Sequence, residues 1–337
     1  MIQKNVSLSK LTTFGIGGKA KYFDRVNTKS NLVNAIDFAR KNKLKLFVLG
    51  GGSNILVGDQ GFNGLVLKIN NTYLDVKNGI VLAGAGIIWD DLVKKTVSLG
   101  LSGIECLSGI PGSVGGAPVQ NIGAYGQELK DTFLSLNAFD IVTNKFVEFS
   151  KKNCKFDYRD SIFKDEKYRN RYIIWEVSLG LNKASPLPPT YKSLVDYLEE
   201  KKVKRLTLFK IRRAVLTLRK KNHIDPKIAG NAGSFFKNPI IPKKELARFL
   251  AKHPDMPNFP LENGDVKLFA GWLIESAGWK GKKYKNVMVS PKHALIIINP
   301  KGRARAKEVA ELSQLIRNDV KRKFNIMLEH EVNFVNI

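Results

Sequence analysis

A glycine-rich stretch at residues 103–128 limits most strongly what this chain can fold into. It reads GIECLSGIPGSVGGAPVQNIGAYGQE and holds seven glycines and two prolines but few charges. Glycine lets backbone N–H groups approach a ligand closely, whereas proline interrupts helices and central strands. The stretch therefore predicts a run of turns, which either connect the strands of a β-rich domain or line a site for phosphates and flat rings.

A second glycine turn, LGGGSN at 49–54, stands between two short apolar runs that we predict to be strands. Its backbone N–H groups suit an anion, and Ser53 and Asn54 add side-chain donors. The turn does not match GxGxxG, because Ile55 stands where the third glycine belongs, and the chain contains no GxxxxGK[ST]. The sequence thus disfavours the Rossmann and P-loop folds.

Hydrophobic periodicity predicts an α+β chain in which strands outnumber helices. The predicted strands lie at 44–57 (interrupted by the glycine turn), 62–69, 79–87, 293–298 and 326–335. The predicted helices lie at 31–41, 191–202, 211–221, 243–252, 267–277 and 304–323. The segment ASPLPPT at 184–190 breaks the pattern with three prolines. A chain of 337 residues is too long for one ordinary core, so we expect two or three domains, with a boundary in or just after the helices at 191–221.

The last predicted strand, IMLEHEVNFV at 326–335, has two different faces. Its alternation places Glu329, Glu331 and Asn333 on one face. The apolar side chains share the other face, namely Ile326, Leu328, Val332 and Phe334. A face with two carboxylates either meets solvent or lines a polar cleft, and the alternation does not decide between them.

The chain has 56 basic and 30 acidic residues, a formal net charge of +26. Nucleic-acid binding, polyanionic small ligands, or a lysine-rich surface without a role would each account for this surplus. The basic residues are dispersed, most densely at 201–221, with no zinc-finger spacing and no aromatic pattern for stacking bases. Charge alone leaves the three explanations open.

The remaining composition excludes other classes of protein. Cys106 and Cys154 are too few for a disulfide framework, and the four histidines show no ligand spacing, so we expect no metal site. No apolar run approaches the roughly 20 residues that cross a bilayer, and the first residues lack the apolar core of a signal peptide. We therefore expect a cytoplasmic protein that does not bind membranes.

Six separated segments, in this order, resemble the UDP-N-acetylenolpyruvoylglucosamine reductase family of bacterial peptidoglycan precursor synthesis. They are TTFGIGG at 12–18, GGGSN at 50–54, SGIPGSVGGAPVQNIGAYG at 108–126, YRDSIFK at 158–164, GNAGSFFKNP at 230–239 and LEHEV at 328–332. The resemblance covers essentially the whole chain. Tyr191, after the proline break, resembles the subgroup with an extra tyrosine-bearing loop over the substrate.

The resemblance implies an FAD-binding fold of the vanillyl-alcohol oxidase (PCMH) type. Its two subdomains would span 1–65 and 66–205, followed by a C-terminal α+β substrate-binding domain at 206–325 and a strand at 326–337 that returns to the active site. The FAD pyrophosphate would be held by the turn at 50–54, and the flavin would lie along 108–126. The implied cofactor-binding residues are Gly50, Gly51, Gly52, Ser53, Asn54, Ser108, Gly109, Ile110, Pro111, Gly112, Gly115, Gly116, Ala117, Asn121, Gly123 and Ala124.

The implied reaction has two halves. NADPH reduces FAD and leaves; the enolpyruvyl sugar then takes a hydride from flavin N5 at its terminal vinyl carbon and a proton at the adjacent carbon. Charge that develops on the substrate carboxylate needs fixed donors, a role assigned to Arg159 and to a protonated Glu331 with a raised pKa. Ser234 is the implied proton donor. Glu329 is the adjacent alternative to Glu331, which aligns with the second glutamate of an LEPEV-like motif in which this chain has His330 in place of proline.

The implied substrate contacts are spread from the glycine-rich stretch to residue 280. They are Tyr125, Tyr158, Tyr191, Arg219, Asn238, Lys267 and Lys280, with His293 as a further candidate. The chain departs from the family pattern KLPDP, since residues 222–226 read NHIDP. Asn222 therefore occupies the position of the family lysine, and Lys221 directly precedes it.

Together these features predict an FAD- and NADPH-dependent flavoprotein of cell-wall biogenesis, cell shape and cell division, a monomer that binds no nucleic acid. A non-catalytic basic protein that binds nucleotides or nucleic acid is the alternative, and a flavin oxidase is a third possibility.

Overall fold

The structure is a computed structural model that describes residues 1–183, 186 and 188–337. Ala184, Ser185 and Leu187, in the predicted proline break, lie outside the described residues. The chain divides into two compact units. Unit 1 comprises residues 1–6, 20–52 and 62–221, and unit 2 comprises residues 7–19, 53–61 and 222–337.

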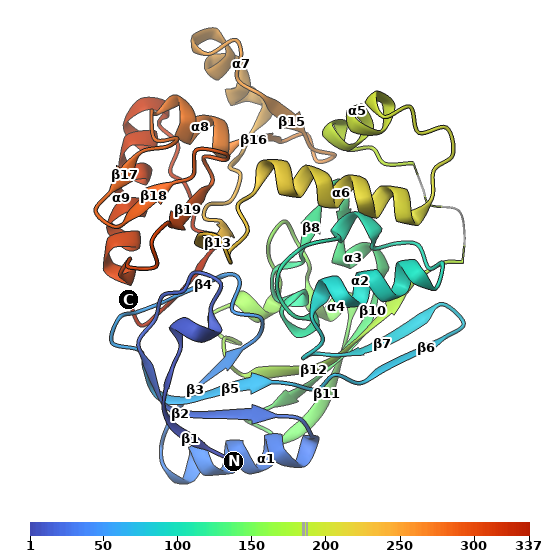
Figure 1. The fold of residues 1–337 in the computed structure, drawn as a ribbon, viewed down its shortest axis with the longest axis vertical. Helices are drawn as coiled ribbons and strands as arrows, with labels where there is room; N and C mark the ends of the chain where they lie inside the picture. Colours follow the sequence, from blue (N-terminus) through green and yellow to red (C-terminus); the bar gives the residue numbers. More distant parts are fainter. Residues whose placement is uncertain (184–185, 187) are drawn as a thin grey trace. The chain divides into compact units, whose positions relative to one another are not determined.

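Unit 1 contains a four-stranded sheet in the order β1-β2-β5-β3, in which β2, β5 and β3 run parallel (Figure 1). The strands are β1 (Gln3–Ser7), β2 (Lys19–Val26), β3 (Lys45–Leu49) and β5 (Phe62–Ile69). Helix α1 (Lys29–Lys41) begins at Thr28, whose hydroxyl accepts the N–H of Asn31 at 3.1 Å. Its buried residues, spaced for one helical face, are Leu32, Ala35, Ile36 and Ala39. The helix connects β2 to β3, two parallel strands that lie on either side of β5.

A second sheet of unit 1 is antiparallel, in the order β11-β10-β12-β7-β6. Its strands are β6 (Leu74–Lys77), β7 (Ile80–Gly84), β10 (Phe133–Asp140), β11 (Lys145–Ser150) and β12 (Tyr172–Gly180). The helices of this part are α2 (Trp89–Ser98), α3 (Leu129–Thr132), α4 (Lys151–Cys154), α5 (Lys192–Glu200) and α6 (Leu208–Asn222). Both sheets and α2 contribute to one hydrophobic core, which includes Leu65, Trp89 and Phe139.

The glycine-rich stretch forms turns, as the sequence predicts. Within residues 103–128 the only regular elements are short 3-10 turns and the two-residue strands β8 (Gly123–Ala124) and β9 (Gln127–Glu128). The connecting residues Tyr125 and Gly126 both have positive φ, +49° and +87°. This is the pattern of a type I′ hairpin turn, which matches the twist of the flanking strands.

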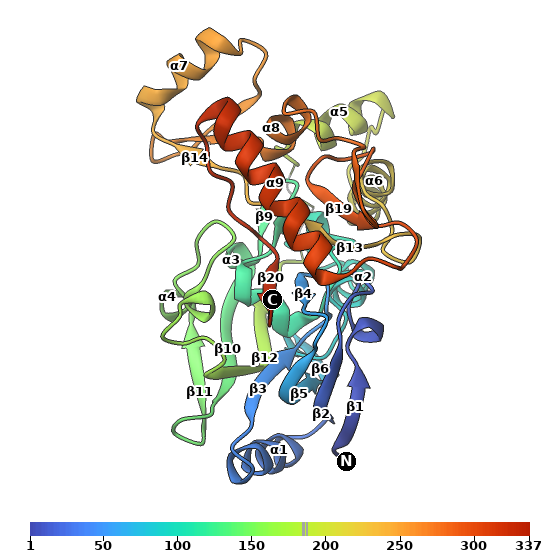
Figure 2. The ribbon, with the colours of Figure 1, turned by 90° about the vertical axis from the view of Figure 1, so that its left-hand side faces the viewer.

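Unit 2 is built around the antiparallel sheet β13-β19-β18-β17. Its strands are β13 (Gly230–Ser234), β17 (Lys283–Tyr284), β18 (Val287–Val289) and β19 (Ile296–Asn299). Helix α9 (Ala306–Phe324) packs against β18 and against α8 (Ala270–Ser276), and Figure 2 shows the two helices side by side. The remaining elements are β4 (Ile55–Val57), β14 (Ile240–Ile241), α7 (Lys243–Lys252), β15 (Asn258–Pro260), β16 (Val266–Leu268) and β20 (Asn333–Val335).

Three predicted elements of unit 2 need correction. The strand predicted at 326–335 contains only β20, because residues 328–332 contact other segments individually rather than through a continuous ladder. The predicted alternation is visible in burial as far as Val332, since Ile326, Leu328 and Val332 are buried; beyond it, Phe334 is half-buried and Val335 is buried. The helix predicted at 267–277 begins at Ala270, after strand β16, and the strand predicted at 293–298 is shifted to Ile296–Asn299.

The structure also bears on membrane insertion and metal binding. No helix of the described ranges has the length and apolar character that crossing a membrane requires. In those ranges we also find no group of three or more histidine, cysteine, aspartate or glutamate side chains placed to hold a metal ion. Cys106 and Cys154 are buried thiols, and burial raises the pKa of each to about 12.

Candidate functional site

In unit 1 the two glycine turns that the sequence shows separately lie against each other. A Cβ atom on Gly51 would stand 2.5 Å from the Cα of Gly112, and one on Gly50 would stand 2.9 Å from the Ser113 hydroxyl. Gly52 and Gly112 have φ of +67° and +133°, values that L side chains rarely adopt. The two turns therefore expose backbone to one another without intervening side chains, a surface suited to a pyrophosphate or a flat ring.

Two of the predicted cofactor-binding side chains, those of Ser108 and Asn121, form hydrogen bonds within the protein. The Ser108 hydroxyl donates to the carbonyl of Glu105 at 2.6 Å, and Ser108 is buried. Buried Asn121 has φ of +42°; its amide donates to Glu128 and to the carbonyl of Asp157, while its oxygen accepts the N–H of Lys130. Both side chains thus shape the glycine stretch itself.

Arg159 is held in a strained backbone conformation beside the β8–β9 hairpin. Its φ is +53°, and its guanidinium donates to the carbonyl of Gly123 at 2.6 Å. The guanidinium also lies 5.5 Å from the centre of the Tyr158 ring. Residues with such backbone angles persist where the surrounding structure enforces them, which is frequent at functional sites. The structure thus brings Arg159, Tyr158 and the glycine stretch together, as three of the predicted contacts require.

Tyr125, Tyr191 and Arg219 form a second group in unit 1. The rings of Tyr125 and Tyr191 meet edge to face, with centroids 5.6 Å apart. Burial raises the pKa of Tyr125, an effect that the nearby charge of Arg219 opposes. Burial also lowers the pKa of the Arg219 guanidinium, which makes no hydrogen bond with the described part of the chain. A desolvated cation without a bonded partner favours binding of an anion.

In unit 2 a bulge in β13 sets the position of Ser234. The pairing of β13 with β19 shifts between Asn231 and Ser234, and Gly233 has φ of +72°. The Asn231 amide donates to the carbonyls of Ile224 and Ala229, and its oxygen accepts the N–H of Gly233 at 3.0 Å. Bulges of this kind re-aim side chains next to active sites. The half-buried Ser234 hydroxyl makes no hydrogen bond with the residues that the structure describes, so its proton is available.

The C-terminal segment of unit 2 lies antiparallel to the residues that follow Ser234. The N–H of Glu331 donates to the carbonyl of Phe235 at 2.9 Å, and the N–H of Lys237 donates to the carbonyl of Glu329 at 2.9 Å. The amide of Asn54 donates to the carbonyl of Glu331 at 3.1 Å. Glu331 is thus bonded to Phe235, the residue that follows Ser234, and to Asn54.

The two glutamates of this segment have different surroundings. Glu329 pairs with Lys237 at 3.3 Å and has 73% of its side chain exposed. Glu331 is half-buried. Glu331 is therefore the more shielded from solvent of the two carboxylates, and Glu329 the more exposed.

The predicted substrate contacts in unit 2 come from separate elements. Asn238 uses its oxygen to accept the N–H of Ala270 at 3.0 Å, at the start of α8. Lys267 in β16 lies 5.0 Å from the centre of the Phe259 ring. Lys280 pairs with Glu275 at 2.8 Å. Burial, and then the charge of Lys280, lower the pKa of His293, so this candidate is a neutral imidazole near a lysine.

Sequence reasoning missed residues that organise the site from a distance. Thr13 donates its hydroxyl to the carbonyl of Asn231 at 2.7 Å and so supports the bulge before Ser234. His223, in the NHIDP segment, stacks on His293 with ring centroids 5.7 Å apart. No spacing in the sequence links these pairs, because each joins segments that meet only in the folded chain.

Comparison with known proteins covers the whole chain. Residues 20–149 match an FAD-binding domain, and residues 225–335 match the C-terminal domain of UDP-N-acetylenolpyruvoylglucosamine reductase. A reductase of this name from Pseudomonas fluorescens (strain Pf-5) is 39% identical over 98% of both chains. One from Amoebophilus asiaticus is 40% identical over 99% of both chains. A solved UDP-N-acetylenolpyruvylglucosamine reductase from Thermus caldophilus superposes with a TM-score of 0.70, 27% identity and coverage of 99% of this chain and 100% of that chain.

The chain belongs to the UDP-N-acetylenolpyruvoylglucosamine reductase family. The predicted resemblance is confirmed, and so is the predicted fold class, an FAD-binding fold with a C-terminal α+β domain. The chain is an FAD-dependent oxidoreductase, which decides against the alternative of a non-catalytic basic binding protein. The glycine cradle of unit 1 fits FAD, because close approach to backbone is what a dinucleotide pyrophosphate requires.

Proposed function

We propose that this chain reduces UDP-N-acetylglucosamine enolpyruvate to UDP-N-acetylmuramate, with NADPH as the electron donor, in peptidoglycan precursor synthesis. The observation that carries this proposal is 39–40% identity to named reductases over at least 98% of the chain. The basic surplus of the chain suits the ligands, because FAD, NADPH and a UDP-sugar carboxylate are all anionic.

The cofactor would be held by the glycine turns at 50–52 and 108–116, with Ser53 and Asn54 continuing the first turn. Backbone N–H groups dominate here, since Ser108 and Asn121 are committed to internal hydrogen bonds. When bound, FAD supplies the hydride that reaches the terminal vinyl carbon of the substrate from flavin N5.

Arg159 and Glu331 are proposed to stabilise the substrate carboxylate. Hydride addition to the vinyl carbon places negative charge on this carboxylate in an enediolate-like intermediate. A guanidinium presents a fixed pair of donors to such a group, and a protonated carboxylic acid donates one further hydrogen bond. The strained backbone of Arg159 and the half-buried position of Glu331 support these roles.

Ser234 is proposed to donate the proton that the carbon next to the carboxylate receives. A serine hydroxyl is a weak acid, so the acceptor must be strongly basic, as a carbanion-like intermediate is. The bulge stabilised by Asn231 holds Ser234, and the chain leaves its hydroxyl proton unengaged in the described residues.

Further substrate contacts are proposed for each unit separately. Tyr125, Tyr158 and Arg219 are proposed contacts in unit 1, and Tyr191 is a proposed contact to the UDP portion from the same unit. In unit 2, Asn238, Lys267 and Lys280 would complete the UDP contacts. Lys221, the last residue of unit 1, would substitute for the family lysine whose position Asn222 occupies.

The proposal extends to the cellular setting and the domain plan. We propose a monomeric cytoplasmic enzyme that binds no nucleic acid and supports cell shape and division. We also propose the four-part division into FAD-binding subdomains at 1–65 and 66–205, a substrate domain at 206–325 and a C-terminal segment at 326–337 that returns to the active site, of which only Asn333–Val335 is a strand.

A two-step anaerobic experiment tests the function. The purified protein should be yellow, should bleach when NADPH is added without oxygen, and should regain its colour when the enolpyruvyl sugar follows. Recolouring by oxygen but not by the sugar would instead identify an oxidase. A protein that cannot be loaded with FAD would exclude the proposal.

A further inference from the structure

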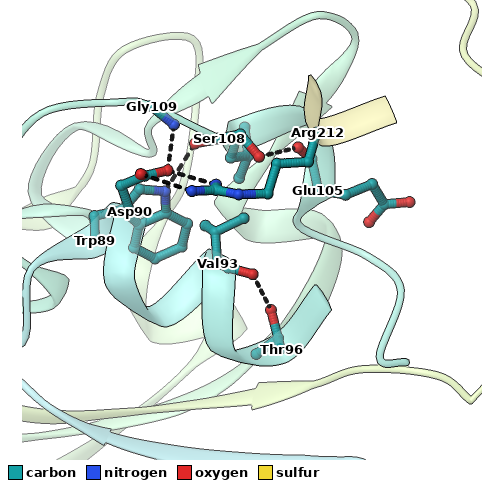
Figure 3. A network of polar contacts seen from close by, with 9 residues as sticks. Trp89, Asp90, Val93, Thr96, Glu105, Ser108, Gly109 and Arg212 are labelled. Atoms are coloured by element: carbon teal, nitrogen blue, oxygen red, sulfur yellow. Dashed lines mark hydrogen bonds and ion pairs between the residues drawn. The ribbon is translucent and has the colours of Figure 1, made fainter. Parts of the chain in front are cut away.

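Two charged residues far apart in the sequence meet at the glycine-rich stretch of unit 1. Asp90 in α2 and Arg212 in α6 form a bidentate ion pair, with N–O distances of 2.6 and 2.8 Å (Figure 3). The same Asp90 carboxylate accepts the N–H of Gly109 at 2.6 Å. Arg212 has 12% and Asp90 32% of the side chain exposed, so this pair is partly removed from solvent.

The residue before Asp90 holds the same loop at two more points. The backbone N–H of Trp89 donates to the carbonyl of Gly112 at 3.1 Å, and its indole N–H donates to the carbonyl of Leu107 at 3.1 Å. The first turn of α2 therefore fixes both ends and the middle of the loop 107–112. This loop needs fixing, because its two glycines, at φ of +70° and +133°, have wide conformational freedom.

Helix α6 covers the loop from the other side. A Cβ atom on Gly109 would stand 2.8 Å from Leu216 and 3.2 Å from Arg219, two residues that follow Arg212 on the helix. The ion pair with Asp90 is the polar bond that joins α6 to α2 at this point (Figure 3). Burial raises the pKa of Asp90, but the hydrogen bonds from Arg212 and from the N–H of Gly109 outweigh burial and lower it, so the carboxylate is ionised.

We propose that Asp90 and Arg212 are positioning residues for FAD, whose ion pair holds the backbone of loop 107–112 in the conformation that binds the cofactor. Neither residue needs to touch FAD; they act through Gly109. The inference rests on the proposed function in one respect, the placement of residues 108–112 along the cofactor.

A second ion pair in unit 1 provides a matched control. Asp140, at the end of β10, accepts a bidentate pair from Arg171 at 3.0 and 2.8 Å and one backbone N–H, that of Val142, at 2.9 Å. Like Asp90, Asp140 thus combines a bidentate arginine with a backbone N–H, and it also accepts the hydroxyl of Thr143. Its partners are residues 142, 143 and 171, which lie outside the glycine-rich stretch.

The test compares Asp90→Asn and Arg212→Gln with Asp140→Asn and Arg171→Gln in the holoenzyme. Flavin release on dilution, followed by fluorescence, measures the FAD dissociation constant, while the visible flavin spectrum and the urea midpoint are recorded in parallel. All four variants should lower the urea midpoint. Only Asp90→Asn and Arg212→Gln should raise the FAD dissociation constant, by about tenfold, as expected when a hydrogen bond to a charged group is lost. Only these two variants should also shift the visible flavin spectrum.

Equal flavin release from both pairs of variants would overturn the inference, since the effect would then follow stability alone. Gly112→Ala separates failure of the inference from failure of the placement, because it distorts the loop directly. Weak FAD binding in Gly112→Ala with normal binding in Asp90→Asn would refute the positioning role of the ion pair but would keep loop 107–112 as a cofactor site. Normal FAD binding in both variants would refute the positioning role of the ion pair and also the placement of residues 108–112 along the cofactor.

Discussion

His330 is a neutral imidazole enclosed by aromatic rings, and its replacement tests how burial affects stability in unit 2. The ring stacks on Phe236 and Phe334, with centroids 5.3 and 4.7 Å away, and meets Phe235 edge-on. Its buried Nε2 has no hydrogen-bond partner in the described residues. Burial, and then the charge of Arg317, lower the pKa of His330 from 6.5 to about 4.

The sign of the resulting pH dependence follows from this shift. The unfolded chain binds a proton at His330 below pH 6.5, whereas the folded chain does so only near pH 4, so acid stabilises the unfolded state between these values. For these two pKa values the free energy of unfolding falls by about 1.8 kcal/mol from pH 7 to pH 5. We expect about 1 kcal/mol, because the ring is partly exposed and solvent screens its charge.

The variant His330→Phe keeps the aromatic contacts and removes the titrating group. Urea denaturation at pH 7 and pH 5 should show that the variant loses about 1 kcal/mol less than the parent protein on acidification. With a denaturant slope of about 1–3 kcal/mol/M, this is a difference of roughly 0.3–1 M in the midpoint shift. At pH 7 the variant should be at least as stable as the parent, since it removes a buried polar atom that lacks a partner.

His253→Phe serves as the control, because His253 also packs on aromatic rings in unit 2, those of Trp272 and Phe324. It reports the general effect of exchanging histidine for phenylalanine. If His330→Phe lost as much stability as the parent between pH 7 and pH 5, the buried neutral imidazole would not be the source of the acid sensitivity.

Three further predictions concern the proposed catalytic segments. Ser234→Ala should leave anaerobic flavin bleaching by NADPH within about twofold of normal while slowing recolouring by the sugar by about 10²-fold or more, as loss of a proton donor does; equal slowing of both half-reactions in stopped-flow absorbance would remove the proton-donor role. Glu331→Gln should slow recolouring more than Glu329→Gln, because Glu329 is exposed beside Lys237; the reverse ranking would transfer the role to Glu329. Asn231→Ala should lower the free energy of unfolding by about 2 kcal/mol, since it removes three hydrogen bonds of a buried amide; an unchanged urea midpoint would show that the bulge does not depend on this side chain.

Local patterns predicted many of the elements because their causes are local. Helix α1 was predictable from apolar residues at helical spacing, and β5 from a run of apolar and β-branched residues between turn signals. The C-terminal segment at 326–335 shows what local patterns did not predict. Its alternation in burial is real, but residues 328–332 bond individually to Phe235, Lys237 and Asn54 instead of to a neighbouring strand. Periodicity reports which side chains are buried, not what their backbone pairs with.

For the site, the sequence by itself determined the kind of chemistry, and the tertiary structure decided how the residues are held. Six ordered motifs were enough to predict FAD and a UDP sugar, because together they resemble one reductase family; the glycine turns, the arginine and the serine taken singly did not decide this. Only the fold placed Gly51 against Gly112, Asn231 behind Ser234, and Arg212 on Asp90 across 122 positions. Such contacts join distant segments, and their energies depend on burial and geometry that no local spacing encodes.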